Sequence, residues 1–293
     1  MSAGRNSSAR ATHWVWWLIF AVLIVYVATR LGAFAFSADV ESPSGVVRLP
    51  NTFASVDHPF HVARAEMLWR ELGSGHLLRW VSQHQGGYPV EFYPLGEAWL
   101  EVAVRALSLG TLSAEGAHTL SVIAIFLAPG IAFASLARLD GWSPAVGVLA
   151  LVLHISLPGS WYHGGYTELV QWGLVTNVAA AVAAFLMLPA LVRFLHAGEG
   201  WMGATAAFLA AGAIYCNPRS LLGLAALGAG AWLASAYLPL GRVGRTRHAK
   251  VAAAGDAGIA PTSDSVGGLE VRMAQVGVLA ALLSAPELAA LAR

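Results

Sequence analysis

A short stretch after the first apolar segment holds most of the residues that could do chemistry. It begins Asp57-His58-Pro59-Phe60-His61 and, by residue 91, includes four histidines, four carboxylates and three arginines. An acidic residue and a histidine one helical turn apart can share a proton, bind a divalent metal or simply hydrogen-bond each other. In a chain that is otherwise mostly hydrocarbon, this concentration of ionisable groups favours catalysis or ligand binding here.

The residues from Asp57 onward carry the signals of one helix. Asp57 is a favourable N-cap with a proline in the first turn, and Gly73-Ser74-Gly75 is typical of a helix end, so we predict a helix to about Leu72. In such a helix His61 lies on the packed face, with Asp57 at the edge of that face. The alternatives are that Asp57 only caps the helix and that His61 is an ordinary half-buried histidine.

A second segment repeats glycine and aromatic chemistry and reads Trp161-Tyr162-His163-Gly164-Gly165-Tyr166-Thr167-Glu168. Glycines let a loop approach a ligand closely, and aromatic faces suit sugar rings. The alternative is an aromatic collar at the membrane surface with a solvated Glu168. Farther along, Arg219 follows Asn217-Pro218, where it could grip a phosphate through paired hydrogen bonds or extend to the lipid headgroups.

Composition places the chain in a membrane. Hydrophobic residues make up 57% of it and charged residues only 11%, whereas soluble domains carry about 25% charged residues. The net charge is +1 and the arginines are scattered near the ends of apolar runs, which argues against a nucleic-acid partner. The single cysteine, Cys216, excludes an internal disulfide and a cysteine-based metal cluster, and it is expected to be a small buried hydrophobe.

Long apolar runs predict an all-α polytopic membrane protein. A hydrocarbon core of about 30 Å requires roughly 20 apolar residues per helix. About seven stretches approach this length: 14–36, 117–138, 144–160, 171–195, 201–217, 219–240 and 271–293. The first run also contains Ala33-Phe34-Ala35, which imitates a signal-peptide cleavage site, but its length and the spans that follow favour an uncut anchor.

Arginine placement predicts the orientation of these spans. Arg5 and Arg10 put a tail of residues 1–13 in the cytoplasm of the plasma (inner) membrane. The loop 37–116 then lies outside, as does 161–170. The stretch 241–270, rich in Gly, Ala and Ser, becomes a flexible cytoplasmic linker before the last, truncated span.

This orientation requires that residues 93–109 do not cross the membrane. Glu97 and Glu101 fall on one side of a helix there, with Arg105 and Ser108, while apolar residues occupy the other side. We therefore predict an interfacial helix that lies along the membrane surface with this polar side in water.

In their order and placement, several motifs resemble a known family. They are Asp57-His58-Pro59-Phe60-His61, Gly73, Trp80, Gly87-Tyr88-Pro89, Phe92-Tyr93-Pro94-Leu95 and the run from Ala117 to Arg138. The pattern is similar to the bacterial membrane proteins labelled 6-pyruvoyl-tetrahydropterin synthase-related and, more broadly, resembles the GT-C superfamily of polytopic glycosyltransferases. Nothing in the chain resembles the soluble pterin enzyme.

The resemblance implies transfer of a sugar from a polyprenyl-phosphate donor, held in membrane lipid, on the outer face. An acidic residue of the first outer loop typically serves there as base or metal ligand, and Asp57 is the matching position. The expected catalytic residues are Asp57 and His61. The expected substrate-binding residues are His58, Arg64, His163, Glu168 and Arg219. A divalent metal remains open, because Asp57, His58 and His61 are suitable ligand types but no second cluster has a convincing spacing.

Two other classes of function compete with the enzyme. One is a transporter or flippase of a lipid-linked substrate, although the spans carry almost no mid-membrane charge, which coupled transport usually requires. The other is a non-catalytic membrane subunit that binds a protein partner. The chain stops at Arg293 inside or just after its last predicted span, so the sequence leaves open a fragment or truncated gene product, and a complete chain of this length would favour the subunit.

Overall fold

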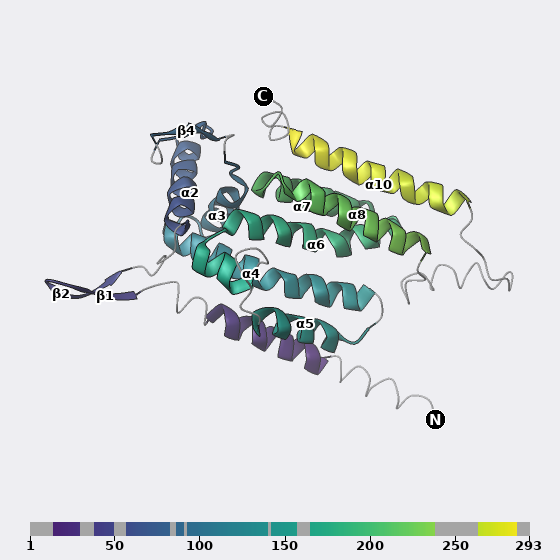
Figure 1. The fold of residues 1–293 in the computed structure, drawn as a ribbon, viewed down its shortest axis with the longest axis horizontal. Helices are drawn as coiled ribbons and strands as arrows, with labels where there is room; N and C mark the ends of the chain where they lie inside the picture. The colour runs from purple at the N-terminus through teal and green to yellow at the C-terminus, as the bar shows by residue number, and fades with distance from the viewer. Residues whose placement is uncertain are drawn as a thin grey trace.

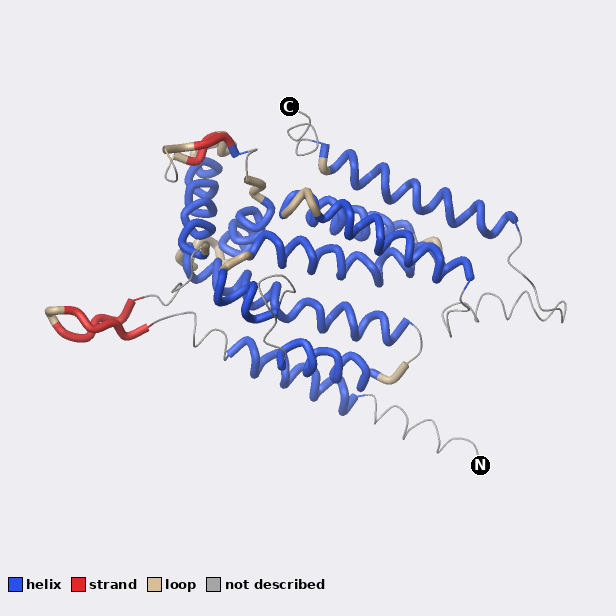
Figure 2. The backbone as a smooth tube through the Cα atoms, viewed as in Figure 1, coloured by secondary structure: helices blue, strands red, loops and turns tan. Residues whose placement is uncertain are grey.

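The computed structural model shows a predominantly helical protein. It describes residues 14–29, 38–49, 57–82, 86–90, 93–139, 142–156, 165–237 and 263–285. Figures 1 and 2 show a bundle of helices lying alongside one another, with two further helices gathered at one end. The bundle helices are Trp14–Thr29, α4 (Ala114–Leu139), α5 (Pro144–Ser156), α6 (Val175–Ala197), α7 (Gly200–Cys216), α8 (Ser220–Tyr237) and α10 (Ser263–Leu283).

Two of the described helices, α4 and α6, are long and apolar enough to cross a membrane, with 26 and 23 residues. Four other apolar helices are shorter. The helix α6 begins at Val175 instead of residue 171, because residues Thr167–Trp172 form a separate π-helix, η2, that ends at Gly173 in the left-handed conformation (φ 77°). The helix α10 begins at Ser263, inside the stretch 241–270 that the sequence analysis assigned to a linker.

Two short antiparallel hairpins depart from the all-α expectation. Strand β1 (Ala38–Ser42) pairs with β2 (Gly45–Leu49), and β3 (Trp80–Val81) pairs with β4 (Tyr88–Pro89). The first hairpin extends away from the bundle, and the second covers one end of α2 (Figure 2). Alternation of side chains over so few residues is too brief to register as a strand pattern, which is why the sequence did not predict them.

Two apolar cores hold the bundle together. One joins Trp14–Thr29, α4, α5, η2 and the first half of α6, and the other joins the second half of α6 to α7, α8 and α10. Alanines at positions 206, 207, 210 and 211 line the buried face of α7. Small side chains let neighbouring helices approach closely, which is how helices associate where lipid removes the ordinary hydrophobic driving force.

The helices α2 (His58–Gly73) and α3 (Gly96–Leu107) pack against each other at the end of the bundle (Figure 1). The observed ends of α2 confirm the helix predicted from Asp57 to the Gly73-Ser74-Gly75 stop. A small core that includes Leu68, Val81 and Ala98 joins α2, α3 and the β3–β4 hairpin. These two helices and the start of α4 position the candidate site.

The first turn of α3 touches the end of α7 at Gly96. A Cβ atom there would lie 2.5 Å from the Cys216 backbone nitrogen, so a backbone would have to move. We expect Gly96→Ala to lower the free energy of unfolding by about 1–3 kcal/mol, as overpacking does, measured by denaturation in detergent micelles. Gly212→Ala is the matched control, since a Cβ there would meet nothing within 4 Å apart from its chain neighbours and the backbone of its own helix. Equal stability of the two variants would contradict this contact.

Candidate functional site

Six ionisable side chains are buried together where α2, α3 and α4 meet. They are His58, His61 and Arg64 from α2, Glu97 and Glu101 from α3, and His118 from α4, and we call them the buried cluster. The most exposed of them, His58, is only 3% exposed. Three-residue steps along α2 and a four-residue step along α3 place these side chains on facing sides of the two helices.

His61 and Glu97 form the first pair of the cluster. The His61 Nδ1 lies 2.7 Å from Glu97 Oε1, and the Arg64 guanidinium donates to the same oxygen at 3.2 Å. A carboxylate only accepts hydrogen bonds, so His61 Nδ1 carries a hydrogen, and whenever the ring is neutral its Nε2 presents a lone pair. Within the described residues this buried Nε2 has no hydrogen-bond partner. The pair therefore has the arrangement of an imidazole base oriented by a carboxylate.

Arg64 keeps Glu97 ionised and holds the backbone of the residues that precede α3 in place. Its guanidinium donates to the carbonyl oxygens of Tyr93 and Pro94, both at 2.6 Å, and lies 4.6 Å from the centre of the Tyr93 ring. Burial alone would raise the pKa of Glu97, but the neighbouring Arg64 and His61 outweigh it and hold the pKa at about 2. Glu97 is therefore an anion at neutral pH.

The second group of the cluster is a chain of hydrogen bonds. Glu101 Oε1 lies 2.6 Å from His118 Nδ1, and His118 Nε2 lies 2.8 Å from His58 Nδ1. His58 Nε2 lies 3.0 Å from the carbonyl oxygen of Val170 in η2. Burial, with the negative charge of Glu97, raises the pKa of Glu101 well above its ordinary value. Burial, with the neighbouring His118, lowers the pKa of His58 to about 3.

The predicted pairing of Asp57 with His61 was wrong. Asp57 occupies the N-cap position and is half-buried, but its side chain makes no capping hydrogen bond. The imidazole of His61 is bonded to Glu97, because α3 packs across the face of α2 that the sequence alone left open. Arg64, which we expected to bind substrate, is fully buried and already hydrogen-bonded to Glu97 and two carbonyl oxygens.

The structure brings the two predicted outer segments together at one point. Val170 of η2 accepts the hydrogen bond from His58, and Glu168 of the same π-helix is buried. Arg219 is exposed in the turn after α7, where its backbone N–H donates to Asn217 Oδ1 at 3.0 Å. His163 lies outside the described residues, so its predicted role remains a prediction.

We predicted that the polar side of α3 faces water, and the structure shows that it is buried. Glu97 and Glu101 are 1% and 2% exposed, while Trp99 and Leu107 are 41% and 85% exposed. The carboxylates turn inward because α2 and α4 offer buried histidines and an arginine as partners. Sequence reasoning missed three site residues as a result, although the signal was present: two glutamates four residues apart, and His118 at the start of an otherwise apolar span.

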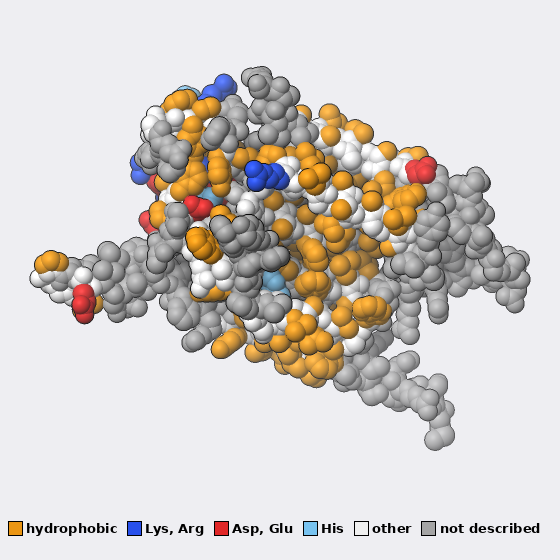
Figure 3. Space-filling model, in the orientation of Figure 1, with side chains coloured by type: hydrophobic (Ala, Val, Ile, Leu, Met, Phe, Trp, Pro, Cys, Tyr) orange, Lys and Arg blue, Asp and Glu red, His pale blue; other side chains and the backbone are white. Residues whose placement is uncertain are grey.

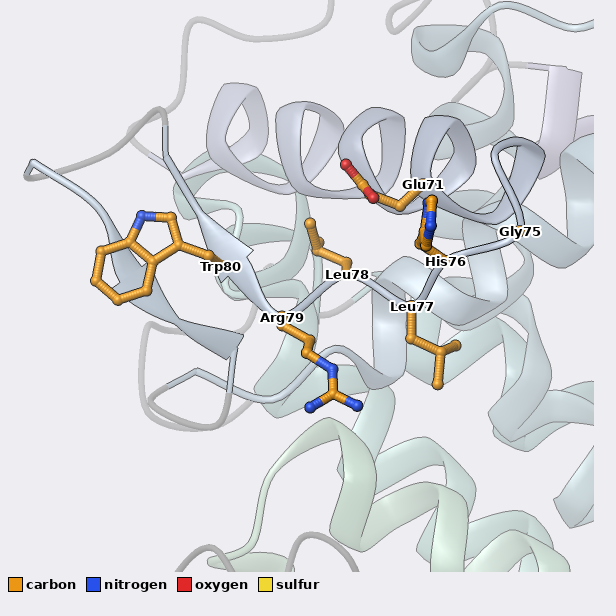
Figure 4. Close-up of a pocket in the computed structure, with 7 residues that line it drawn as sticks. All are labelled: Glu71, Gly75, His76, Leu77, Leu78, Arg79 and Trp80. Atoms are coloured by element: carbon orange, nitrogen blue, oxygen red, sulfur yellow. The ribbon is translucent and has the colours of Figure 1, made fainter.

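Open cavities lie on the surface near the buried cluster. One, of about 510 Å³, is lined by Glu71 and residues 75–80, and Figure 4 shows Glu71 and His76 near the end of α2 with Trp80 farther along the strand. A second, of about 560 Å³, lies beside Glu66, Arg70 and Arg105. Neither lining includes a residue of the buried cluster. Within the described residues, no group of three or more His, Cys, Asp or Glu side chains is arranged so that it could hold a metal ion.

No protein-family model, curated protein or solved structure matches this chain. The chemistry of the buried cluster therefore carries the functional inference.

Proposed function

We propose that this chain is a multi-pass protein of the plasma (inner) membrane, with about seven spans and a cytoplasmic N-terminus. The two long apolar helices support this, as do large apolar side chains exposed on the bundle, such as Leu18 at 65%, Phe208 at 69% and Leu222 at 82%. Figure 3 shows hydrophobic side chains over most of the described part of the visible bundle face. An apolar surface this extensive is typical of contact with lipid.

The proposed orientation gives a labelling prediction. Residues 37–116 and 161–170 lie outside, and position 256 lies inside. In a variant with Cys216 replaced by Ala, a new cysteine at Asp256 should react with a membrane-impermeant thiol reagent only after the cells are opened. A new cysteine at Ser44, which is exposed beside β1, should react in intact cells. Labelling of position 256 from outside intact cells would contradict the orientation.

For the activity, we infer a GT-C-like glycosyltransferase that moves a sugar from a polyprenyl-phosphate donor at the outer face. The observation that carries this proposal is the buried pair of His61 and Glu97, in which His61 Nε2 has no hydrogen-bond partner among the described residues. An acceptor hydroxyl needs a base within hydrogen-bond reach as it attacks the sugar. In this proposal His61 Nε2 is that base, and the acceptor reaches it only when the structure opens, because the nitrogen is buried here. The transporter reading has no comparable observation of its own.

The remaining groups of the site have parts in the same reaction. His61 Nε2 takes the acceptor proton, the anionic Glu97 stabilises the imidazolium that forms, and Arg64 keeps Glu97 ionised. Burial of all three keeps water from competing with the acceptor. We retain Arg219, His163 and Glu168 as proposed contacts to the donor, because a phosphate favours an arginine and sugar hydroxyls favour short polar groups.

The direct test is a transfer assay. Membrane vesicles containing the protein are mixed with a panel of radiolabelled polyprenyl-phosphate sugars and an envelope-glycan extract, and the label in the glycan is counted. We expect transfer from one donor and none with vesicles that lack the protein. Folded protein that transfers no sugar from any donor of the panel would contradict the glycosyltransferase proposal.

The variant Asp57→Asn tests which of two carboxylates, Asp57 or Glu97, assists His61. Asparagine caps a helix about as well as aspartate, and the side chain of Asp57 makes no capping bond in any case. We expect folded protein in normal amount and a transfer rate within roughly threefold of the unmodified protein, since a change below about 0.7 kcal/mol is of that size. A loss of roughly 10²-fold, the usual scale for a general base, would return the catalytic role to Asp57.

A further inference from the structure

The hydrogen-bond chain from Glu101 to Val170 has a fixed direction. A carbonyl oxygen can only accept, so the Val170 carbonyl requires a hydrogen on His58 Nε2. If His58 is neutral, its Nδ1 is then an acceptor and His118 Nε2 must donate to it. A neutral His118 in turn accepts at Nδ1, and Glu101 must donate to it. The geometry thus requires a proton on the Glu101 carboxyl whenever both imidazoles are neutral.

The surroundings favour this neutral form. Glu101 is 2% exposed and has the anionic Glu97 one turn before it on α3, so a second negative charge there is unfavourable. The cation Arg64 and the ring of His61 face it from α2, but Arg64 is bonded to Glu97. His58 is faced by His118 from α4 and by His61 from its own helix, and neither favours a positive charge on it.

We propose that Glu101, His118 and His58 form a proton relay that stores one proton on Glu101 and delivers it from His58 Nε2. In delivery, the His58 Nε2–H bond breaks and the proton goes to an acceptor oxygen. The His118 Nε2 proton moves to His58 Nδ1, and the Glu101 carboxyl proton moves to His118 Nδ1. Both imidazoles end neutral, each changed from the Nε2–H to the Nδ1–H tautomer, and Glu101 ends as a carboxylate. One proton leaves the relay, and no other reactant is required.

The receiving oxygen is assigned on the basis of the proposed function. When the sugar leaves a polyprenyl-phosphate donor, the carbon–oxygen bond breaks and its electron pair stays on the phosphate, which gains negative charge. A proton from His58 Nε2 neutralises that charge, while His61 takes the proton of the acceptor hydroxyl. The phosphate oxygen would replace the Val170 carbonyl as the partner of His58. Val170 lies in a π-helix, an irregular form that occurs frequently at functional sites.

The unmodified protein provides the first test of the relay. Infrared spectra of protein with ¹³C-labelled glutamate should contain a protonated carboxyl C=O band at neutral pH. The band should be lost in Glu101→Gln, whose amide can still donate to His118, and kept in Glu41→Gln on the exposed β1–β2 hairpin. Nitrogen-15 spectra should assign the Nε2–H tautomer to His58. Absence of the carboxyl band, or the Nδ1–H tautomer on neutral His58, would overturn the relay.

Transport of the proton is tested by hydrogen–deuterium exchange of the same band. His58→Gln keeps a donor for Val170 and an acceptor for His118 but cannot pass a proton on. We expect exchange of the Glu101 proton to slow by roughly tenfold or more, as about 1.4 kcal/mol of additional barrier would cause. His76→Gln, at an exposed position after α2, is the control. Unchanged exchange in folded His58→Gln would overturn the relay as a route for the proton.

Addition of undecaprenyl phosphate then separates the relay from its proposed destination. A change in the His58 Nε2 chemical shift, together with loss of the Glu101 carboxyl band, supports delivery to a lipid phosphate. Inorganic phosphate at the same concentration should have no effect. A relay that passes the infrared and exchange tests but does not respond to undecaprenyl phosphate overturns this destination and counts against the glycosyltransferase. A missing relay leaves His61 and the transfer assay unaffected.

Discussion

Replacing His61 by Gln is expected to lower the rate of sugar transfer by roughly 10²-fold or more, the usual scale for losing a general base. Glutamine can still donate a hydrogen bond to Glu97, so the buried carboxylate keeps a partner. It presents no basic nitrogen, however, and cannot take the acceptor proton. The measurement is the initial rate of transfer in vesicles at saturating donor, together with the amount of folded protein.

The matched control for this variant is His76→Gln, an identical chemical change at an exposed position outside the buried cluster. It should leave the transfer rate unchanged. If His61→Gln retains the full rate in folded protein, His61 is not the base. The buried pair of His61 and Glu97 would then have no catalytic role, and the glycosyltransferase proposal would lose its main support.

Replacing Arg64 by Met is expected to cost about 3–5 kcal/mol in the free energy of unfolding, as loss of one partner from a buried ion pair does. Methionine fills much of the arginine volume but leaves Glu97 as a buried anion with only His61 beside it. Two carbonyls before α3 also lose their donor. The loss is measured by unfolding the protein with a denaturant in mild detergent micelles while its tryptophan fluorescence is monitored.

Two further variants identify the cause of that loss. Arg70→Met removes an arginine whose side chain is 73% exposed and paired with Glu66 on the same helix, so it should cost at most about 0.5 kcal/mol. The double variant Arg64→Met with Glu97→Gln removes both charges and should recover part of the stability. An Arg64→Met variant as stable as Arg70→Met would show that the buried pair does not form.

The helices of this chain could be predicted from the sequence, because their signals are local. Apolar runs marked the bundle helices, and an N-cap, a proline and a glycine stop marked α2 with its correct ends. The π-helix η2 and the two short hairpins were not predicted. Their formation depends on packing and on glycines in left-handed conformations, such as Gly173, and not on a repeated pattern.

The site was predicted only in part, because its partners are brought together by tertiary packing. The region around His58 and His61 was singled out by its density of ionisable groups, and in the structure both histidines belong to the buried cluster. The carboxylate partners were not, since Glu97 is 36 residues from His61 in sequence and its side chain was assigned to water. Polar residues on one side of an apolar helix are usually interpreted as a solvated face. The same pattern arises when that side meets buried charges of opposite sign, so the sequence alone does not distinguish the two.

The four-residue spacing of Glu97 and Glu101 gives α3 a role as a common support. Its 12 residues carry both the carboxylate that orients His61 and the carboxyl at the head of the relay. A rotation or slide of this one short helix would separate both groups from their histidines in a single movement. Both histidine–carboxyl contacts therefore depend on the position of one element, and a displacement of α3 that breaks the His61–Glu97 hydrogen bond would break the His118–Glu101 hydrogen bond as well.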